Sequence, residues 1–265
     1  MKTLNDECVL VNRLRDEDVD RIVTVGNEKE CKHIINCLLD DKNFKCWVEN
    51  SGKSDPPPDY YSDQFNLMME IMRVDDCAYV NSKNRVVNKT LQAENLIIQE
   101  IRNKFPEFNN SNFTIITNSN SGLETFEDHN YKRYYENFNR VIKKHKESIP
   151  IYKKNHPNHK LIFYVYDEST AYIEVANESS VKPNYQYQEL IFAERLHEFY
   201  LDNRFTEVIR NCGADYVIWY APNKYVNSKD IGLLDIPKVI VYEVKAINCE
   251  SEFKYNENLM ISCEM

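Results

Sequence analysis

Glycine is scarce in this sequence, and no glycine-rich phosphate-binding motif is present. Only 5 of the 265 residues are glycine. Neither G-x-G-x-x-G nor G-x-x-x-x-G-K-S/T occurs, and the G-x-S-x-G nucleophile motif is also absent. Nucleotide-dependent kinases, P-loop ATPases and Rossmann dehydrogenases hold phosphates on such loops. They are therefore poor candidates for this chain.

Long apolar segments are absent as well. The longest clean run is LIFYVY at 161–166, whereas a membrane-spanning helix needs about 20 apolar residues. Residues 1–20 contain no apolar stretch followed by a small-residue cleavage site, so no secretory signal is predicted. We therefore expect a cytoplasmic protein without a membrane partner.

Paired cysteine motifs are missing too. The eight cysteines are widely spaced with no C-x-x-C pair, which argues against a zinc ribbon or a thioredoxin-like redox site. We interpret them as buried thiols that act as small apolar residues. His156 and His159 form an H-x-x-H pattern, but Pro157 lies between them, so the two rings are not expected to share a helix face. We interpret this pair as an ordinary loop feature.

Positive charge is concentrated in one segment of an acidic chain. The formal net charge is −9, yet residues 131–160 hold nine Lys or Arg against two Glu. Aromatic residues recur there at helical spacing and predict a buried stripe, which leaves the basic residues exposed. We predict that these bind the phosphates of a nucleic acid or an acidic protein partner. The basic set consists of Lys132, Arg133, Arg140, Lys143, Lys144 and Lys146.

Periodicity predicts a mixed α+β chain. In the first half we expect a helix at 28–39, strands at 43–50, 59–63 and 67–74, a helix at 89–104 and a strand at 112–119. In the second half we expect a helix at 131–147, a hairpin at 160–176, a long helix within 187–211, and strands at 214–221 and 238–246. We predict one mixed domain with a core over about residues 28–118 and a helical and β extension over about 119–265.

Two carboxylates in the segment PPPDYYSDQFNLMMEIMR, residues 56–73, indicate a metal site. Asp59 begins one predicted strand and Glu70 lies inside the next, so a turn at 63–66 would pair their strands. Phosphodiester hydrolysis at neutral pH uses a divalent metal that neutralises the phosphate and lowers the pKa of a bound water. Magnesium suits this role because it takes carboxylate oxygens and keeps several waters. Manganese is the second candidate cofactor.

The element order of the first half, together with this acidic pair, resembles the αβββαβ core of the PD-(D/E)XK nuclease superfamily, the restriction-endonuclease-like fold. The resemblance implies that Asp59 and Glu70 hold the metal and that a glutamate of the first helix, Glu30 or Glu28, assists them. The family pattern has a lysine two positions after the second acid, where this sequence has Met72. Methionine can neither carry charge nor donate a proton, so the role of the lysine falls to another residue or is lost.

Two other groups of acidic residues are alternative candidates for a catalytic site. Asp235, Glu243 and Lys245 supply a literal E-x-K on the strand expected at 238–246, within a less suitable order of elements. Asp167 and Glu174 face each other across the hairpin expected at 160–176 and would suit an unrelated hydrolase, although a turn rich in Asp, Glu, Ser and Thr explains them more simply.

These observations leave two leading functions. The first is a metal-dependent nuclease-like protein that acts on nucleic-acid phosphodiesters, either active or degenerate. The alternative is a non-catalytic module on the same scaffold that binds nucleic acid or protein. Magnesium dependence is expected of the first and not of the second.

Overall fold

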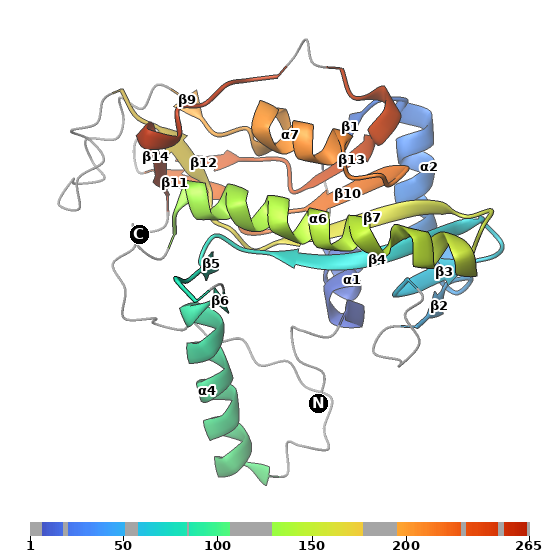
Figure 1. The fold of residues 1–265 in the computed structure, drawn as a ribbon, viewed down its shortest axis with the longest axis horizontal. Helices are drawn as coiled ribbons and strands as arrows, with labels where there is room; N and C mark the ends of the chain where they lie inside the picture. The colour runs from blue at the N-terminus through green and yellow to red at the C-terminus, as the bar shows by residue number, and fades with distance from the viewer. Residues whose placement is uncertain are drawn as a thin grey trace.

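A seven-stranded mixed sheet lies at the centre of the fold (Figure 1). The computed structural model describes residues 7–17, 21–50, 58–83, 85–106, 129–176, 195–228, 232–248 and 252–263. Across the sheet the strands are β1 (Ile22–Val25), β13 (Val239–Glu243), β10 (Tyr216–Tyr220), β7 (Lys160–Asp167), β4 (Leu67–Val74), β3 (Tyr60–Ser62) and β2 (Val48–Glu49). Strands β4, β7 and β10 run parallel, and β2, β3 and β4 form an antiparallel meander.

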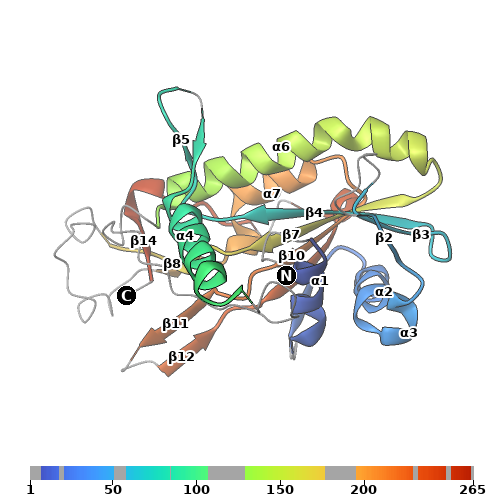
Figure 2. The same cartoon turned by 90° about the horizontal axis from the view of Figure 1, so that it is seen from below.

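Helices cover both faces of the sheet and produce three layers (Figure 2). One face carries α6 (Tyr131–Asn155) and α7 (Asn203–Arg210). The other carries α1 (Glu7–Asp16), α2 (Glu28–Leu39) and α3 (Asp41–Phe44). A central strand between two helical layers is buried on both sides, which explains the uninterrupted apolar run of β7. Its Phe163 packs towards α6, and its Tyr164 packs in the core on the side of α1 and α2.

The long basic helix is α6, and its apolar stripe is buried as predicted. Asn130 caps it by accepting from the Arg133 amide over 3.1 Å. The helix predicted at 131–147 is confirmed and continues to Asn155, with Pro150 inside it. The stripe residues, of which all but Tyr135 are buried, are Tyr131, Tyr134, Tyr135, Phe138, Val141 and Ile142.

The turn between β1 and α2 depends on a glycine. Gly26 has φ +111°, a conformation that L side chains rarely adopt. A Cβ at this position would lie 2.9 Å from Glu243 Cβ, so the end of β13 leaves no room for one. Asn27 then caps α2 by accepting from the amides of Lys29 and Glu30.

Smaller elements surround the three layers. The hairpin of β5 (Tyr79–Val80) and β6 (Val86–Val87) leads to α4 (Lys89–Lys104), which projects away from the sheet in Figure 1. The other small elements are β8 (Tyr172–Glu174), β9 (Arg195–Leu196), β14 (Met260–Ser262), β11 (Tyr225–Ser228), β12 (Gly232–Asp235), η4 (Phe199–Leu201), η5 (Val244–Ala246) and η7 (Glu257–Leu259). Among the described residues, no helix has the length and apolar character needed to cross a bilayer.

Most predicted elements are confirmed, including helices at 28–39 and 89–104 and strands within 59–63, 67–74, 214–221 and 238–246. The strand predicted at 43–50 shrinks to two residues, because Asp40 caps a helical turn that occupies Asp41–Phe44. The strand predicted at 112–119 lies outside the described residues.

Two predictions for the second half are wrong. The hairpin at 160–176 does not form, because β7 pairs with β4 and β10 in the central sheet whereas β8 pairs with β14 and β9. In the described part of 187–211, only Asn203–Arg210 is α-helical, and β9 precedes it. The predicted extension at 119–265 supplies β7, β10 and β13 to the central sheet, so the sheet draws on both halves of the chain.

Candidate metal and nucleic-acid site

Asp59 and Glu70 face each other on neighbouring antiparallel segments. In the β3–β4 pair Tyr60 aligns with Met69, and the same register places Asp59 opposite Glu70. The Ile71 amide of β4 donates a hydrogen bond to Asp59 Oδ2 over 2.8 Å, so the Asp59 side chain accepts from the backbone of the neighbouring strand. The structure thus brings together the two carboxylates that were predicted to pair.

Burial and the neighbouring Glu70 carboxylate raise the pKa of Asp59 to about 7. The charge of Glu7 in α1 also raises the pKa of Asp59, whereas the hydrogen bond from the Ile71 amide lowers it. Among the described residues, the main influences on this carboxyl include no positively charged group. A neighbouring pair of acids in which one pKa is strongly raised is typical of metal sites and of acid–base sites.

Helix α6 supplies the other neighbours of Glu70. His145 Nδ1 lies 2.8 Å from Glu70 Oε1, and the two groups form an ion pair when the imidazole is protonated. Tyr152 also hydrogen-bonds to Glu70, and burial together with this carboxylate raises the pKa of the Tyr152 hydroxyl. Glu70 is only 7% exposed, so these contacts fix its carboxylate between β4 and α6.

Met72, at the position where the PD-(D/E)XK pattern has lysine, lies in the hydrophobic core. Met72 is 3% exposed and packs between the sheet and α6. Arg73 points to the opposite face and forms an ion pair with Glu168. Of the described side chains, His145 is the basic group that hydrogen-bonds to the Asp59–Glu70 pair.

Glu30 lies away from this pair. It accepts from the Tyr216 hydroxyl over 3.2 Å and lies 3.8 Å from Lys160 Nζ. Tyr216 packs in the core layer that faces α2, whereas Glu70 points towards α6. The structure therefore does not bring Glu30 to the Asp59–Glu70 pair, because α2 covers the other face of the sheet.

The alternative E-x-K site is divided between two sheets. Asp235 ends β12, which pairs with β11, whereas Glu243 ends β13 in the central sheet. Glu243 Oε2 accepts from the Asn27 amide over 3.0 Å at the N-terminus of α2, where a carboxylate is favourable. Lys245 is exposed in η5. The structure thus gives Glu243 a capping role and places Asp235 in a different sheet.

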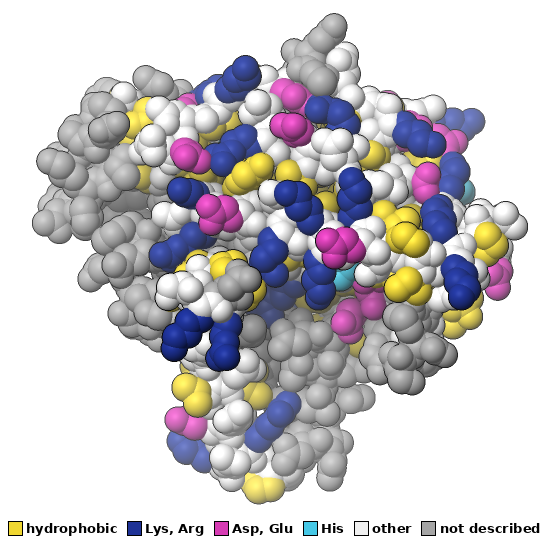
Figure 3. All heavy atoms as spheres, viewed as in Figure 1, with side chains coloured by type: hydrophobic (Ala, Val, Ile, Leu, Met, Phe, Trp, Pro, Cys, Tyr) yellow, Lys and Arg dark blue, Asp and Glu magenta, His cyan; other side chains and the backbone are white. Residues whose placement is uncertain are grey.

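Basic side chains gather over α6 on the face shown in Figure 3. Of the predicted set, Lys132, Lys143, Lys144 and Lys146 are exposed. The two arginines are partly buried and have local partners, since Arg133 lies over the Tyr79 ring and Arg140 donates to Asn137. A shallow hollow of about 420 Å³ opens along this face. Its described lining residues are Glu136, Asn139, Arg140, Lys143, Lys144 and Glu147.

Asp167 and Glu174 do not form a site together. Glu174 pairs with Arg195 at 2.6 Å. Asp167 is fully buried, and its oxygens accept from the Tyr134 hydroxyl, the Trp219 indole and Ser169. The separation follows from the absent hairpin, since β7 and β8 belong to different sheets.

Replacing Asp59 by Asn is expected to stabilise the protein at pH 8. A raised carboxyl pKa means that this group's contribution to stability is present below its unfolded-state pKa near 4 and is lost as the pH rises through about 7. Asn keeps an oxygen for the Ile71 amide but carries no charge. We expect a gain of about 2 kcal/mol in the free energy of unfolding at pH 8 and much less at pH 4.

Urea unfolding at both pH values measures this difference. Asp16→Asn, which changes an exposed acid of α1, is the matched control and is expected to leave stability within about 0.5 kcal/mol. Equal stability of Asp59→Asn and the wild-type protein at pH 8 would show that burial and Glu70 do not destabilise the ionised Asp59 carboxylate.

Sequence reasoning missed His145 and Tyr152 as partners of Glu70. Both continue the buried stripe of α6, because they lie at helical spacing from Phe138 and Ile142. That spacing predicts that both side chains face the sheet. Which strand lies beneath His145 and Tyr152 depends on the parallel pairing of β4 with β7. Local sequence does not predict that pairing.

Comparison with known proteins adds no assignment, since no family model, no curated protein and no solved structure matches this chain.

Proposed function

We propose that this protein is a divalent-metal-dependent, nuclease-like protein that acts on nucleic-acid phosphodiesters through Asp59 and Glu70. The observation that carries the proposal is the cross-strand pairing of these two carboxylates, with the pKa of Asp59 raised to about 7. Perturbed acids in a specific pair are candidates for functional groups.

The order of elements supports the resemblance to the PD-(D/E)XK superfamily. Helix α2 is followed by the meander β2, β3 and β4, and then by α6 and the parallel strand β7. This is an αβββαβ sequence, interrupted by α3 between α2 and β2 and by β5, β6 and α4 between β4 and α6. The second helix and the last strand of this order are α6 and β7, whereas the sequence pattern predicted them at 89–104 and 112–119. Asp59 immediately precedes the second strand, and Glu70 lies in the middle of the third.

The acidic pair fits a hard divalent cation. Magnesium is commonly held by one or two carboxylates and keeps several waters, so it needs no larger protein cage. The Asp59 carboxyl is destabilised by Glu70, and a cation between them would offset that repulsion. When bound, such an ion supplies charge neutralisation at the phosphate and a water of lowered pKa. Asp59 and Glu70 would hold it.

Other residues of this chain are suited to binding the substrate rather than the metal ion. His145 hydrogen-bonds to Glu70, which places an imidazole beside the acidic pair. The exposed lysines of α6, Lys143 and Lys144, lie on the same helix and line the hollow described above. Their charge favours a phosphate backbone, and this attraction weakens as salt rises.

The buried Met72 favours a second candidate function, a binding module that does not hydrolyse its ligand. A nuclease of this superfamily is expected to have lysine at that position, and here the side chain is part of the core. Such a module would use the basic face of α6 to bind nucleic acid or an acidic protein, without dependence on magnesium.

Calorimetric titration of magnesium into the purified protein tests the metal site. We expect binding by the wild-type protein and an affinity at least about tenfold weaker in Asp59→Ala and in Glu70→Gln, which corresponds to about 1.4 kcal/mol. Asp16→Ala serves as the control because it removes an exposed acid remote from the pair. Unchanged affinity in both site variants would contradict the assignment, and no binding by the wild-type protein would favour the binding module.

A further inference from the structure

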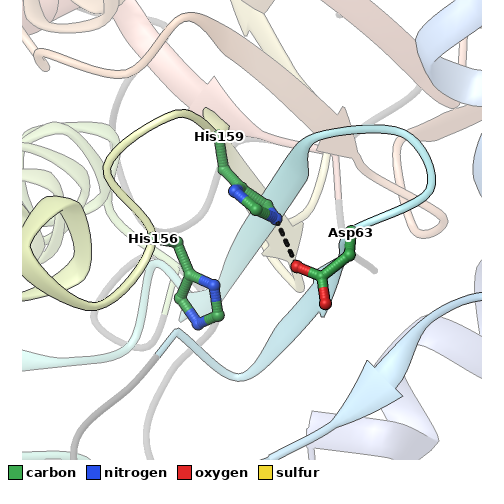
Figure 4. A group of neighbouring side chains, drawn as sticks. All are labelled: Asp63, His156 and His159. Carbon is green, nitrogen blue, oxygen red and sulfur yellow. Dashed lines mark hydrogen bonds and ion pairs between the residues drawn. The ribbon is translucent and has the colours of Figure 1, made fainter.

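The loop between α6 and β7 brings two histidines to the turn between β3 and β4 (Figure 4). His156 is the C-cap of α6, and His159 immediately precedes β7. Asp63 follows β3 directly. These segments are far apart in sequence, so only the tertiary fold places the three side chains together.

The three side chains present their polar atoms to a common point. One oxygen or nitrogen of each residue lies within 4.8 Å of those of the other two. His159 Nε2 is 3.0 Å from Asp63 Oδ1, and the two imidazole rings are 4.9 Å apart at an angle of 63°. His159 is 9% exposed, and its Nδ1 is buried without a hydrogen-bond partner among the described residues.

The backbone of this loop is held in place from both sides. Lys160 donates its amide to the Asn66 carbonyl over 2.8 Å, which ties the loop to the β3–β4 turn. The Lys153 ammonium donates to the His159 carbonyl over 2.7 Å. The His156 ring packs on Tyr61, with ring centroids 4.3 Å apart. The two imidazoles are therefore positioned by contacts that do not use their ligating atoms.

We propose that Asp63, His156 and His159 form a binding site for a first-row transition-metal ion of the zinc class. Two imidazole nitrogens and one carboxylate oxygen are ligands that zinc, cobalt and nickel prefer, and a three-residue set leaves a fourth position for water or substrate. Asp63 is exposed, with a side chain 80% accessible, so this position opens to solvent.

This site differs from the Asp59–Glu70 pair in its donors and in its place. The acidic pair offers only carboxylate oxygens, which suit magnesium, whereas the histidine site offers nitrogen, which magnesium does not favour. Asp63 lies beyond the opposite end of β3 from Asp59. The proposal therefore does not rest on the proposed nuclease function.

A second group with similar spacing is less suited to a metal. Asp76, Cys77 and His129 also lie within 4.8 Å of one another. However, Asp76 is fully buried, and its Oδ2 already accepts from the Tyr172 hydroxyl. The ammonium of Lys224 also acts on this carboxylate, and its positive charge would oppose a bound cation. This group provides a useful control.

Titration of the metal-free protein with cobalt and zinc tests the site. Cobalt reports on its ligands, because thiolate ligands give charge-transfer absorption that nitrogen and oxygen ligands do not. We expect one cobalt or zinc ion per chain, without thiolate absorption. We expect the affinity to fall at least about tenfold in His156→Ala, in His159→Ala and in Asp63→Ala. Magnesium in excess should not displace the ion.

Two variants serve as controls. His33→Ala removes an exposed histidine of α2, and Cys77→Ser removes the thiol of the second group. Neither is expected to change the affinity more than about twofold. Asp63 is an exposed turn residue, so Asp63→Ala should fold normally, which far-UV circular dichroism checks. The proposal is overturned if the wild-type protein binds neither ion, if Asp63→Ala and His159→Ala bind as the wild type does, or if Cys77→Ser abolishes binding.

Discussion

The proposed magnesium-dependent cleavage of nucleic acid is expected to fall at least about a thousandfold when Asp59 and Glu70 are both replaced by alanine. A thousandfold loss corresponds to about 4 kcal/mol of transition-state stabilisation, which is a reasonable share for a metal that neutralises the phosphate and activates water. Single- and double-stranded DNA and RNA are the substrates to compare, with and without magnesium.

The double variant relieves the repulsion between the two carboxylates but also removes the acceptor of His145 and Tyr152, so far-UV circular dichroism must first show that it is folded. A loss of activity would then report on the site rather than on unfolding. The control is Asp16→Ala combined with Glu100→Ala, which removes two exposed acids, one on α1 and one on α4, and is expected to retain full activity. Cleavage that survives the substitution of Asp59 and Glu70 would reject their assignment.

A further outcome separates the two candidate functions. If the wild-type protein binds nucleic acid in a salt-dependent manner but does not cleave it with magnesium or manganese, the binding module becomes the better account. The burial of Met72 at the lysine position would then be the physical reason for the missing hydrolysis. Salt dependence in that case reflects the release of counterions from the phosphates.

Asp167→Ala is expected to reduce the free energy of unfolding by about 3–5 kcal/mol. Asp167 is fully buried, and Lys224, 2% exposed, holds its ammonium 3.5 Å from the Asp167 carboxylate. Burial lowers the pKa of Lys224, and the Asp167 carboxylate opposes that shift. Alanine would leave the buried Lys224 ammonium without one of its two neighbouring carboxylates, since only Asp76 would remain, and would remove an acceptor from Tyr134 and Trp219.

Urea unfolding followed by far-UV circular dichroism measures this loss. Asp16→Ala controls for the removal of an exposed acid and should stay within about 0.5 kcal/mol of the wild-type value. Asp167→Ala combined with Lys224→Met should recover part of the loss, because the unpaired ammonium is then absent. A cost below about 1 kcal/mol for Asp167→Ala would mean that the network is hydrated or that Lys224 is neutral.

The elements that the sequence predicts well are those whose signals are local. Helix α2 is predicted to the residue, because its apolar spacing lies within one short segment. The Asp59–Glu70 pairing also follows from local sequence, since a short turn joins β3 to β4. A hairpin register extends over only a few residues, so it can be read without knowledge of the remaining fold.

The errors arise where the partner of a segment lies far away. Alternation along 172–174 indicates a strand but does not reveal that it pairs with 260–262. Likewise, the H-x-x-H pattern offers two rings, and their third neighbour, Asp63, comes from a turn more than ninety residues earlier. Glu30 fails to reach Glu70 for the same reason, because the sheet face covered by α2 is a property of the whole fold.

The pairing of β1 with β13 sets a condition on how the chain is synthesised and folded. Ile22 aligns with Val239, so a strand that leaves the ribosome early must wait for one made much later. Until β13 arrives, β1 has no sheet neighbour among the described strands, and the edge of β10 is uncovered. Unpaired strand edges recruit other chains, and such distant pairings slow folding. The nascent protein is therefore most open to aggregation, and to chaperone binding, in the interval before β13 emerges.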